Sequence, residues 1–124
     1  MRREGLECER VNRLNPGESR QVPYVEKLLG DGTLPTIAVS DNQIAVPDMI
    51  RQWVGGDYTV LGTDGFGRSD TRPNLRKFFE IDSQSITLAA LSSLVRSGEI
   101  KAEVYNKAMK DLGVSQDRND ITEL

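Results

Sequence analysis

The residues with the clearest chemical potential lie in a glycine-rich loop that comprises Asp64, Gly65, Phe66, Gly67, Arg68, Ser69 and Asp70. In one interpretation, the glycines let backbone N–H groups approach an anion at the start of the following helix, and Arg68 adds positive charge. In the other, the loop is a tight strand-to-helix turn, in which Gly65 and Gly67 relieve backbone strain while Asp64 and Ser69 satisfy N–H groups. We favour the turn, with the anion site as its alternative.

The spacing of the loop departs from two phosphate-binding motifs. No Gly-Lys-Ser/Thr follows it, as a Walker loop requires, and Asp70 stands where a dinucleotide-binding Gly-x-Gly-x-x-Gly motif has its third glycine. Asp41, Asp64 and Asp70 would reach the carboxyl ends of adjacent strands, where open α/β sheets place their sites. Capping and turn roles explain these aspartates as well, and we favour those roles over acid–base or metal chemistry.

Cys8 is the single cysteine, and the chain contains no histidine. The usual zinc ligands, the commonest general base and an internal disulfide are therefore excluded. We expect Cys8 to be an inert, partly buried thiol, and Trp53 to pack with Ile50 rather than form a ligand platform. The sequence assigns no catalytic, cofactor-binding or metal-binding residue.

The composition suits one small domain with a thin core. The chain has 124 residues, 37% of them hydrophobic, and a formal net charge of −3 with both signs interspersed. No basic stripe suits a nucleic acid, and no apolar run suits a membrane span or a signal peptide. We expect a cytoplasmic protein that binds neither nucleic acid nor membrane.

The first half of the chain predicts a parallel βαβ unit behind a polar N-terminal segment. Residues 1–34 indicate loops and short helices, including one at residues 23–29 that puts Val25, Leu28 and Leu29 on one side. Residues 35–40 and 58–62 are β-branched runs typical of strands, and a helix at residues 44–53 with Pro47 in its first turn joins them. Strand, helix and strand at this spacing favour parallel pairing.

Three helices are predicted in the second half. The first, at residues 71–80, would be capped by Ser69 or Asp70, and the next would begin at Asp82 or Ser83 and end at Gly98. Its apolar stripe comprises Ile86, Ala89, Ala90, Leu91 and Leu94. The last, at residues 101–112, would put Val104, Ala108 and Leu112 on one face, before a frayed tail at residues 114–124.

The fold class is therefore α/β, with a small parallel sheet flanked by helices and a helical C-terminal end. We divide the single domain into a loop-rich N-terminal segment (1–34), a βαβ-loop-helix core (35–82), a helical end (83–113) and a tail (114–124). Two strands cannot form an independently stable parallel sheet. We therefore expect a partial domain, or a chain that assembles with another.

Two blocks of the sequence, in order and in spacing, resemble the C-terminal domain of the homodimeric-type pyruvate dehydrogenase decarboxylating component. The main block is YTVLGTDGFGRSDTR at residues 58–72, continued by LR at 75–76 and FEID at 79–82; the upstream block is ECER at 7–10, NRL at 12–14, Pro16, and residues 20–25. The resemblance extends to about Gly98 and fades after Lys101. This chain has Val11, Asn15 and Asn42 where the family usually has Trp, His and Tyr, so it is identified as a divergent member.

The resemblance implies a partial transketolase C-terminal-like domain within a larger subunit. That subunit would decarboxylate pyruvate on thiamine diphosphate and pass the acetyl group to a lipoyl group of the dihydrolipoyl acetyltransferase component. Thiamine diphosphate and magnesium would be held by two other domains, because the only Gly-Asp-Gly here, at residues 30–32, lacks the family's following asparagine pair.

The resemblance also sets the expected role of this chain. It would be inactive alone and structural, completing the subunit fold and supporting a homodimer. Its partners would be the remaining domains of the subunit, a second copy and, in a docking role, the acetyltransferase component. The alternative is a stand-alone anion- or nucleotide-binding or docking module that uses the loop at residues 62–70.

Overall fold

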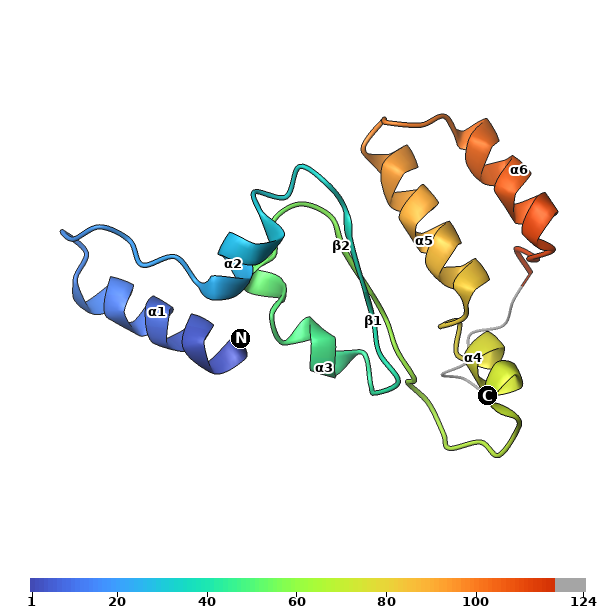
Figure 1. The fold of residues 1–124 in the computed structure, drawn as a ribbon, viewed down its shortest axis with the longest axis horizontal. Coiled ribbons are helices and arrows are strands. Elements are labelled where there is room, and N and C mark those ends of the chain that lie inside the picture. The colour runs from blue at the N-terminus through green and yellow to red at the C-terminus, as the bar shows by residue number, and fades with distance from the viewer. Residues whose placement is uncertain (118–124) are drawn as a thin grey trace.

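Two parallel strands form the centre of the structure, a computed structural model that describes residues 1–117. β1 (Thr36–Val39) lies beside β2 (Tyr58–Leu61), and Thr36 pairs with Tyr58 while Val39 pairs with Leu61 (Figure 1). β-branched side chains make up three of the four residues of β1 and two of the four of β2, and they suit the pleated backbone. The predicted strands, their parallel pairing and the α/β class are confirmed.

The connection between the strands is not the single helix predicted at residues 44–53. It consists of α3 (Ala45–Asp48) and a separate 3₁₀ turn at Arg51–Trp53. The chain leaves helical geometry at Ile50, and its carbonyl accepts the Trp53 N–H at 3.0 Å in a tighter turn. This turn directs Trp53 inward, where its side chain is only 3% exposed, so burial of the indole overrides the helical pattern.

The N-terminal segment contains a long helix, α1 (Arg2–Leu14), so the expectation of only loops and short helices before residue 34 is wrong. The buried positions of α1 are Gly5 and Cys8, whose small side chains give little apolar signal in the sequence. α2 (Tyr24–Leu29) is confirmed, although Pro23 precedes it rather than entering its first turn. Of its three apolar residues only Val25 is buried, while Leu28 and Leu29 are exposed.

Three helices follow β2, as predicted: α4 (Arg72–Phe78), α5 (Ser83–Arg96) and α6 (Ala102–Leu112). Asp82 caps α5 by accepting the Ser85 N–H at 2.9 Å, which confirms that prediction. The N-cap of α4 is Thr71, so the predicted cap at Ser69 or Asp70 is wrong by one or two residues. α5 contacts both strands and α6 packs on α5, whereas α3 lies on the other side of the strands (Figure 1).

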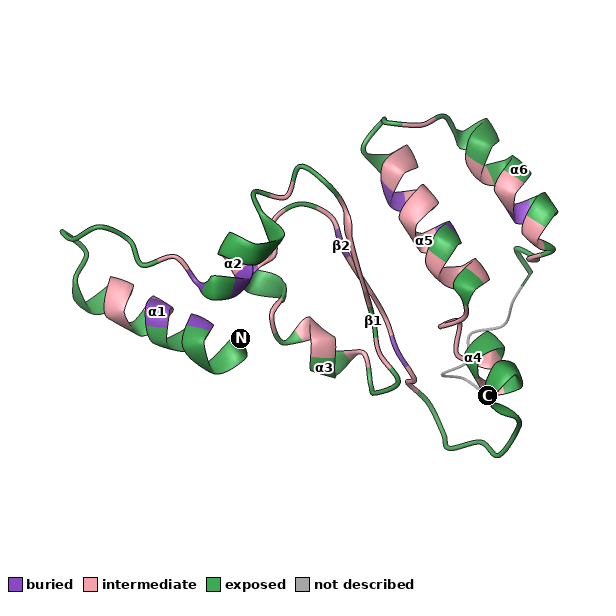
Figure 2. Ribbon diagram, viewed as in Figure 1, coloured by how far each residue is buried: buried purple, intermediate pink, exposed green. Residues whose placement is uncertain are grey.

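Burial is shallow across the whole fold (Figure 2). The predicted apolar stripe of α5 is only half-buried, and the buried residues of this helix, Leu88 and Ser93, lie outside that stripe. On α6 the buried residue is Met109, whereas Val104 is 48% exposed. The face predicted from Val104, Ala108 and Leu112 is therefore turned partly toward solvent. The part of the predicted tail beyond residue 117 lies outside the described residues. Within residues 1–117, no helix combines the length and apolar character needed to cross a membrane.

One ion pair ties α5 to the start of β2. Arg96 donates to the Asp57 carboxylate at 2.6 Å, and its guanidinium also reaches the hydroxyls of Ser93 and Thr59 at 3.1 and 3.4 Å. Hydrogen bonds to the Asp57 carboxylate, first from Arg96 and then from Ser93, lower the pKa of Asp57. The contact therefore joins the C-terminal end of α5 to the residue that precedes β2.

We predict that Arg96→Ala lowers the free energy of unfolding at neutral pH by about 0.5–1 kcal/mol. Because the pKa of Asp57 is lower in the folded than in the unfolded chain, its contribution is present above the unfolded pKa of about 3.9 and is lost as pH falls through the folded pKa. Urea unfolding at several pH values should therefore show the two proteins converging in acid. Arg10→Ala, which removes a more exposed pair with Glu7, is the matched control and should change stability less.

Candidate functional site

A cleft of about 550 Å³ lies between the glycine-rich loop and α4. Thr63 and residues 65–68 of the loop form one wall, and α4 contributes Arg72 and Arg76 to the other. Apolar side chains, among them Leu75 and Phe79, line it between these walls. Its volume falls within the range typical of small-molecule sites.

The wall of the cleft is fixed by hydrogen bonds between the segments that leave the two strands. The Thr63 N–H donates to the Asn42 carbonyl and the Thr63 hydroxyl to the Asp41 carbonyl, both at 3.0 Å. The Ile44 N–H donates to the Asp64 carboxylate at 2.7 Å. Asp64 therefore satisfies a backbone N–H, as the favoured interpretation of the loop as a turn requires.

Glycine is required at two positions near the loop. A Cβ at Gly62 would stand 2.7 Å from the Asn42 carbonyl oxygen, so the two segments can approach only without a side chain there. Gly65 has a φ of +106°, which confirms the predicted special backbone at this position. Gly67 does not have a positive φ, and a Cβ there would meet open space, so the same prediction for Gly67 is wrong.

The three aspartates do not form a joint site. Asp41 lines the cleft, Asp64 binds the Ile44 N–H, and Asp70 accepts hydrogen bonds from Asn74 at 2.8 Å and from the Thr71 N–H at 2.7 Å. The bond from Asn74, and then that from Thr71, lower the pKa of Asp70 and keep it ionised. No group of three or more His, Cys, Asp or Glu side chains within residues 1–117 is arranged to hold a metal.

Of the other predicted loop residues, Arg68 and Phe66 line the cleft. The Arg68 guanidinium carbon lies 4.5 Å from the centroid of the Phe78 ring, a cation–π distance, and the Phe66 side chain is 83% exposed. Ser69 is exposed and does not line the cleft. Arg72 and Arg76 also line the cleft but belong to no motif that marked them as site residues, although their spacing of four on a predicted helix places them on one face.

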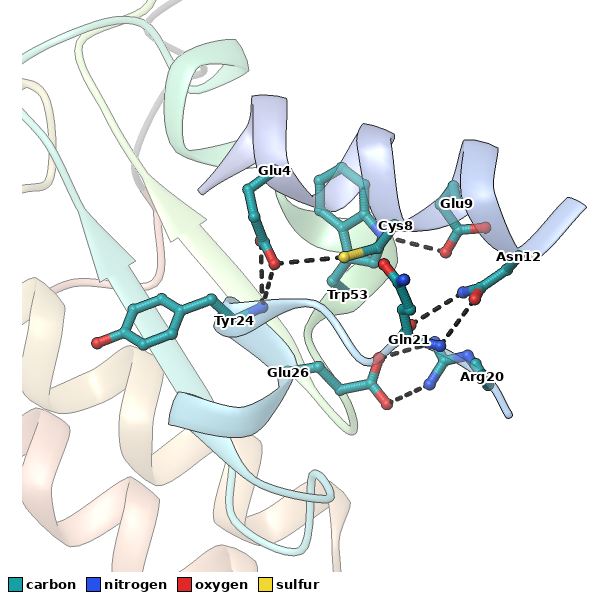
Figure 3. Close-up of polar contacts among 9 residues, drawn as sticks. All are labelled: Glu4, Cys8, Glu9, Asn12, Arg20, Gln21, Tyr24, Glu26 and Trp53. Atoms are coloured by element: carbon teal, nitrogen blue, oxygen red, sulfur yellow. Dashed lines mark hydrogen bonds and ion pairs between the residues drawn. The ribbon is translucent and has the colours of Figure 1, made fainter. Parts of the chain in front are cut away.

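Cys8 lies in a separate network between α1, α2 and Trp53 (Figure 3). The thiol donates to Glu4 at 3.3 Å, and the same carboxylate accepts the Tyr24 N–H at 3.1 Å. Burial, followed by the hydrogen bond to Glu4, raises the pKa of Cys8 and disfavours the nucleophilic thiolate. The expectation of a buried thiol is confirmed. The hydrogen bonds of this network hold α1 against the start of α2.

Trp53 packs against the same buried face of α1, which contains Gly5 and Cys8. Its indole N–H donates to Glu9 at 3.2 Å, and a Cβ at Gly5 would stand 2.7 Å from the indole ring. Asn12 and Gln21 exchange two hydrogen bonds farther along α1 (Figure 3). The predicted packing role of Trp53 is confirmed, with α1 as its partner.

We predict that the glycines of this region differ sharply in their tolerance of alanine. Gly62→Ala and Gly65→Ala should each lower the free energy of unfolding by about 1 kcal/mol or more, because one creates a steric clash and the other strains the backbone. Gly67→Ala is the matched control in the same loop and should stay within about 0.5 kcal/mol of the parent chain. Urea unfolding monitored by circular dichroism checks all three, and a Gly67→Ala effect as large as the others would contradict the assignment.

Comparison with known proteins identifies a matching family profile and several similar proteins. A profile described as the transketolase-like TK C-terminal domain matches residues 10–82. The chain is 45% identical over 121 residues to a pyruvate dehydrogenase E1 component of Pseudomonas aeruginosa, covering 97% of this chain and 14% of that protein. It is 47% identical over 108 residues to that of Mycolicibacterium smegmatis (87% and 12%) and 41% identical over 117 residues to that of Escherichia coli (94% and 13%).

These matches correct the expectation that the resemblance fades after Lys101, and they agree with the expectation of a partial domain. A match that covers 97% of the chain continues past Lys101, where the resemblance was expected to fade. The chain nevertheless spans only 12–14% of the length of these relatives. The matched profile and the parallel sheet with flanking helices agree, and the chain belongs to the transketolase-like C-terminal domain family.

Proposed function

We propose that this chain serves as the C-terminal portion of a pyruvate dehydrogenase decarboxylating subunit and has a structural, dimer-supporting role there. The subunit would convert pyruvate to an acetyl group carried by lipoyl, in the cytoplasm. The observation that carries this proposal is a parallel sheet of two short strands with both outer edges unpaired in the described residues. Such a sheet needs further strands or a partner to be stable.

The backbone of β1 offers a specific place for that partner. The N–H groups of Thr36 and Ser40 donate across to β2, so by the two-residue period of a strand those of Ile37 and Val39 point to the open edge. Leu34, two residues before the strand, is 74% exposed. An additional strand from the rest of the subunit or from a second copy would satisfy this edge and cover apolar surface.

The chemistry of the reaction would reside outside this chain. The family's thiamine diphosphate and magnesium would bind to the other domains of the subunit, and the chain has no histidine to act as a general base. Its contribution to turnover would therefore be the shape and assembly of the subunit. A docking contact with the dihydrolipoyl acetyltransferase component is a second candidate role, which predicts binding to that component's subunit-binding region.

We predict that the isolated chain does not decarboxylate pyruvate when thiamine diphosphate and magnesium are added, because the cofactor site would lie on the other domains of the subunit. Carbon dioxide release is the measurement, with an intact pyruvate dehydrogenase E1 component as the positive control. In a second arm, the chain is mixed with a homologous E1 component shortened by the matching C-terminal residues. Recovery of activity supports the assembly role, and product from the chain alone would contradict it.

We also predict that the chain self-associates through the open edge of β1. Sedimentation velocity should show an average mass that rises with concentration. Val39→Pro should weaken this association, because proline removes an outward N–H without breaking the bonds to β2. Val39→Thr, which keeps that N–H, is the matched control and should associate like the parent chain. A monomer at every concentration would exclude the role of this edge in dimer formation.

A further inference from the structure

We propose that the cleft between the glycine-rich loop and α4 binds a sugar phosphate, either free or as part of a nucleotide. The phosphate would lie on Arg72 and Arg76, and a sugar hydroxyl would donate to Asp41. This inference concerns a site on the chain itself and does not depend on the proposed assembly role.

The strongest argument is the concentration of positive charge. Three arginines, Arg68, Arg72 and Arg76, line the cleft against one carboxylate, Asp41. Arg72 and Arg76 lie four residues apart on α4, a spacing at which like charges repel each other. A bound anion would relieve this repulsion, and guanidinium groups match the oxygen geometry of phosphate well.

Four arginines elsewhere in the described part of the chain pair with carboxylates, whereas those of the cleft do not. Ion pairs within residues 1–117 engage Arg10, Arg20, Arg51 and Arg96. The three arginines of the cleft form none with a carboxylate of the described part of the chain. Arg68 contacts the Phe78 ring, which leaves its charge in place, and its charge also acts on the Asp70 carboxylate without forming an ion pair.

The remaining lining residues favour an organic phosphate over a bare ion. A volume of about 550 Å³ is much larger than phosphate alone requires. The Phe66 ring, 83% exposed at the cleft, offers an apolar face to a sugar or a base. An ionised carboxylate such as Asp41 accepts hydrogen bonds from hydroxyl groups and repels phosphate, so it would orient the ligand with its phosphate toward α4.

The test is calorimetric titration of the full chain with ribose 5-phosphate, AMP, inorganic phosphate and ribose. We expect ribose 5-phosphate to bind more tightly than inorganic phosphate, ribose not to bind, and AMP to show whether a base adds affinity through Phe66. Binding should weaken as ionic strength rises. Absence of binding by both organic phosphates, or equal affinity for these and inorganic phosphate, would overturn the proposal.

Variants locate the ligand within the cleft. Arg72→Gln and Arg76→Gln should each weaken ribose 5-phosphate binding about tenfold, because each removes a charged hydrogen-bond donor. Arg13→Gln, an exposed arginine on α1 far from the cleft in sequence, is the matched control and should leave binding unchanged. Asp41→Asn should reduce the preference for ribose 5-phosphate over inorganic phosphate, with circular dichroism used to verify the fold of each variant. Equal binding by both cleft variants and the parent chain would place the ligand elsewhere and overturn the assignment.

Discussion

The parallel pairing of β1 with β2 is the interaction on which the rest of the described structure depends. It brings the carboxyl ends of both strands together, so that Asn42 and Ile44 can exchange hydrogen bonds with the segment after β2. The same pairing presents one face to α5 and the other to α3, where Tyr58 donates its hydroxyl to the Pro47 carbonyl at 2.8 Å. The strand pairing therefore positions the glycine-rich loop and its cleft at one end of the sheet, and α5 and α3 on its two faces.

A short ladder leaves the protein with little buried apolar surface. The buried hydrophobic side chains of the described part are few and lie in separate places: Cys8, Val25 and Trp53 near α1 and α2, Tyr58 in β2, Leu88 in α5 and Met109 in α6. Hydrophobic burial is the main favourable contribution to folding, and domains are only marginally stable even with a contiguous core. The dispersed core and the unpaired sheet edges therefore leave the described part of the chain with few stabilising contacts. An additional strand or partner would supply more of them.

The sequence was most informative where local chemistry decides the structure. β-branched residues marked both strands, Asp82 marked the start of α5, and Gly98 marked its end, where it adopts a positive φ of 80° just after the C-cap. It was least informative where distant residues decide. α1 went unrecognised because Gly5 and Cys8 become an inner face only once Trp53 packs against them.

The candidate site shows the same division between local and distant information. The loop, the role of Asp64 and the conformation of Gly65 followed from residue type. The requirement for glycine at position 62 did not, because it arises from the Asn42 carbonyl twenty residues earlier in the chain. The cleft itself also depends on how α4 folds back beside the loop, which periodicity within α4 does not specify.

The contact between α1 and the indole of Trp53 has a spectroscopic consequence. Trp53 is the only tryptophan of the chain, so all of its indole emission comes from this one position. The ring is 3% exposed and its N–H donates to Glu9 of α1, so departure of α1 would both hydrate the ring and remove its hydrogen-bond acceptor. The wavelength of maximum tryptophan emission therefore reports whether α1 is packed on Trp53. Far-ultraviolet circular dichroism reports the helices separately.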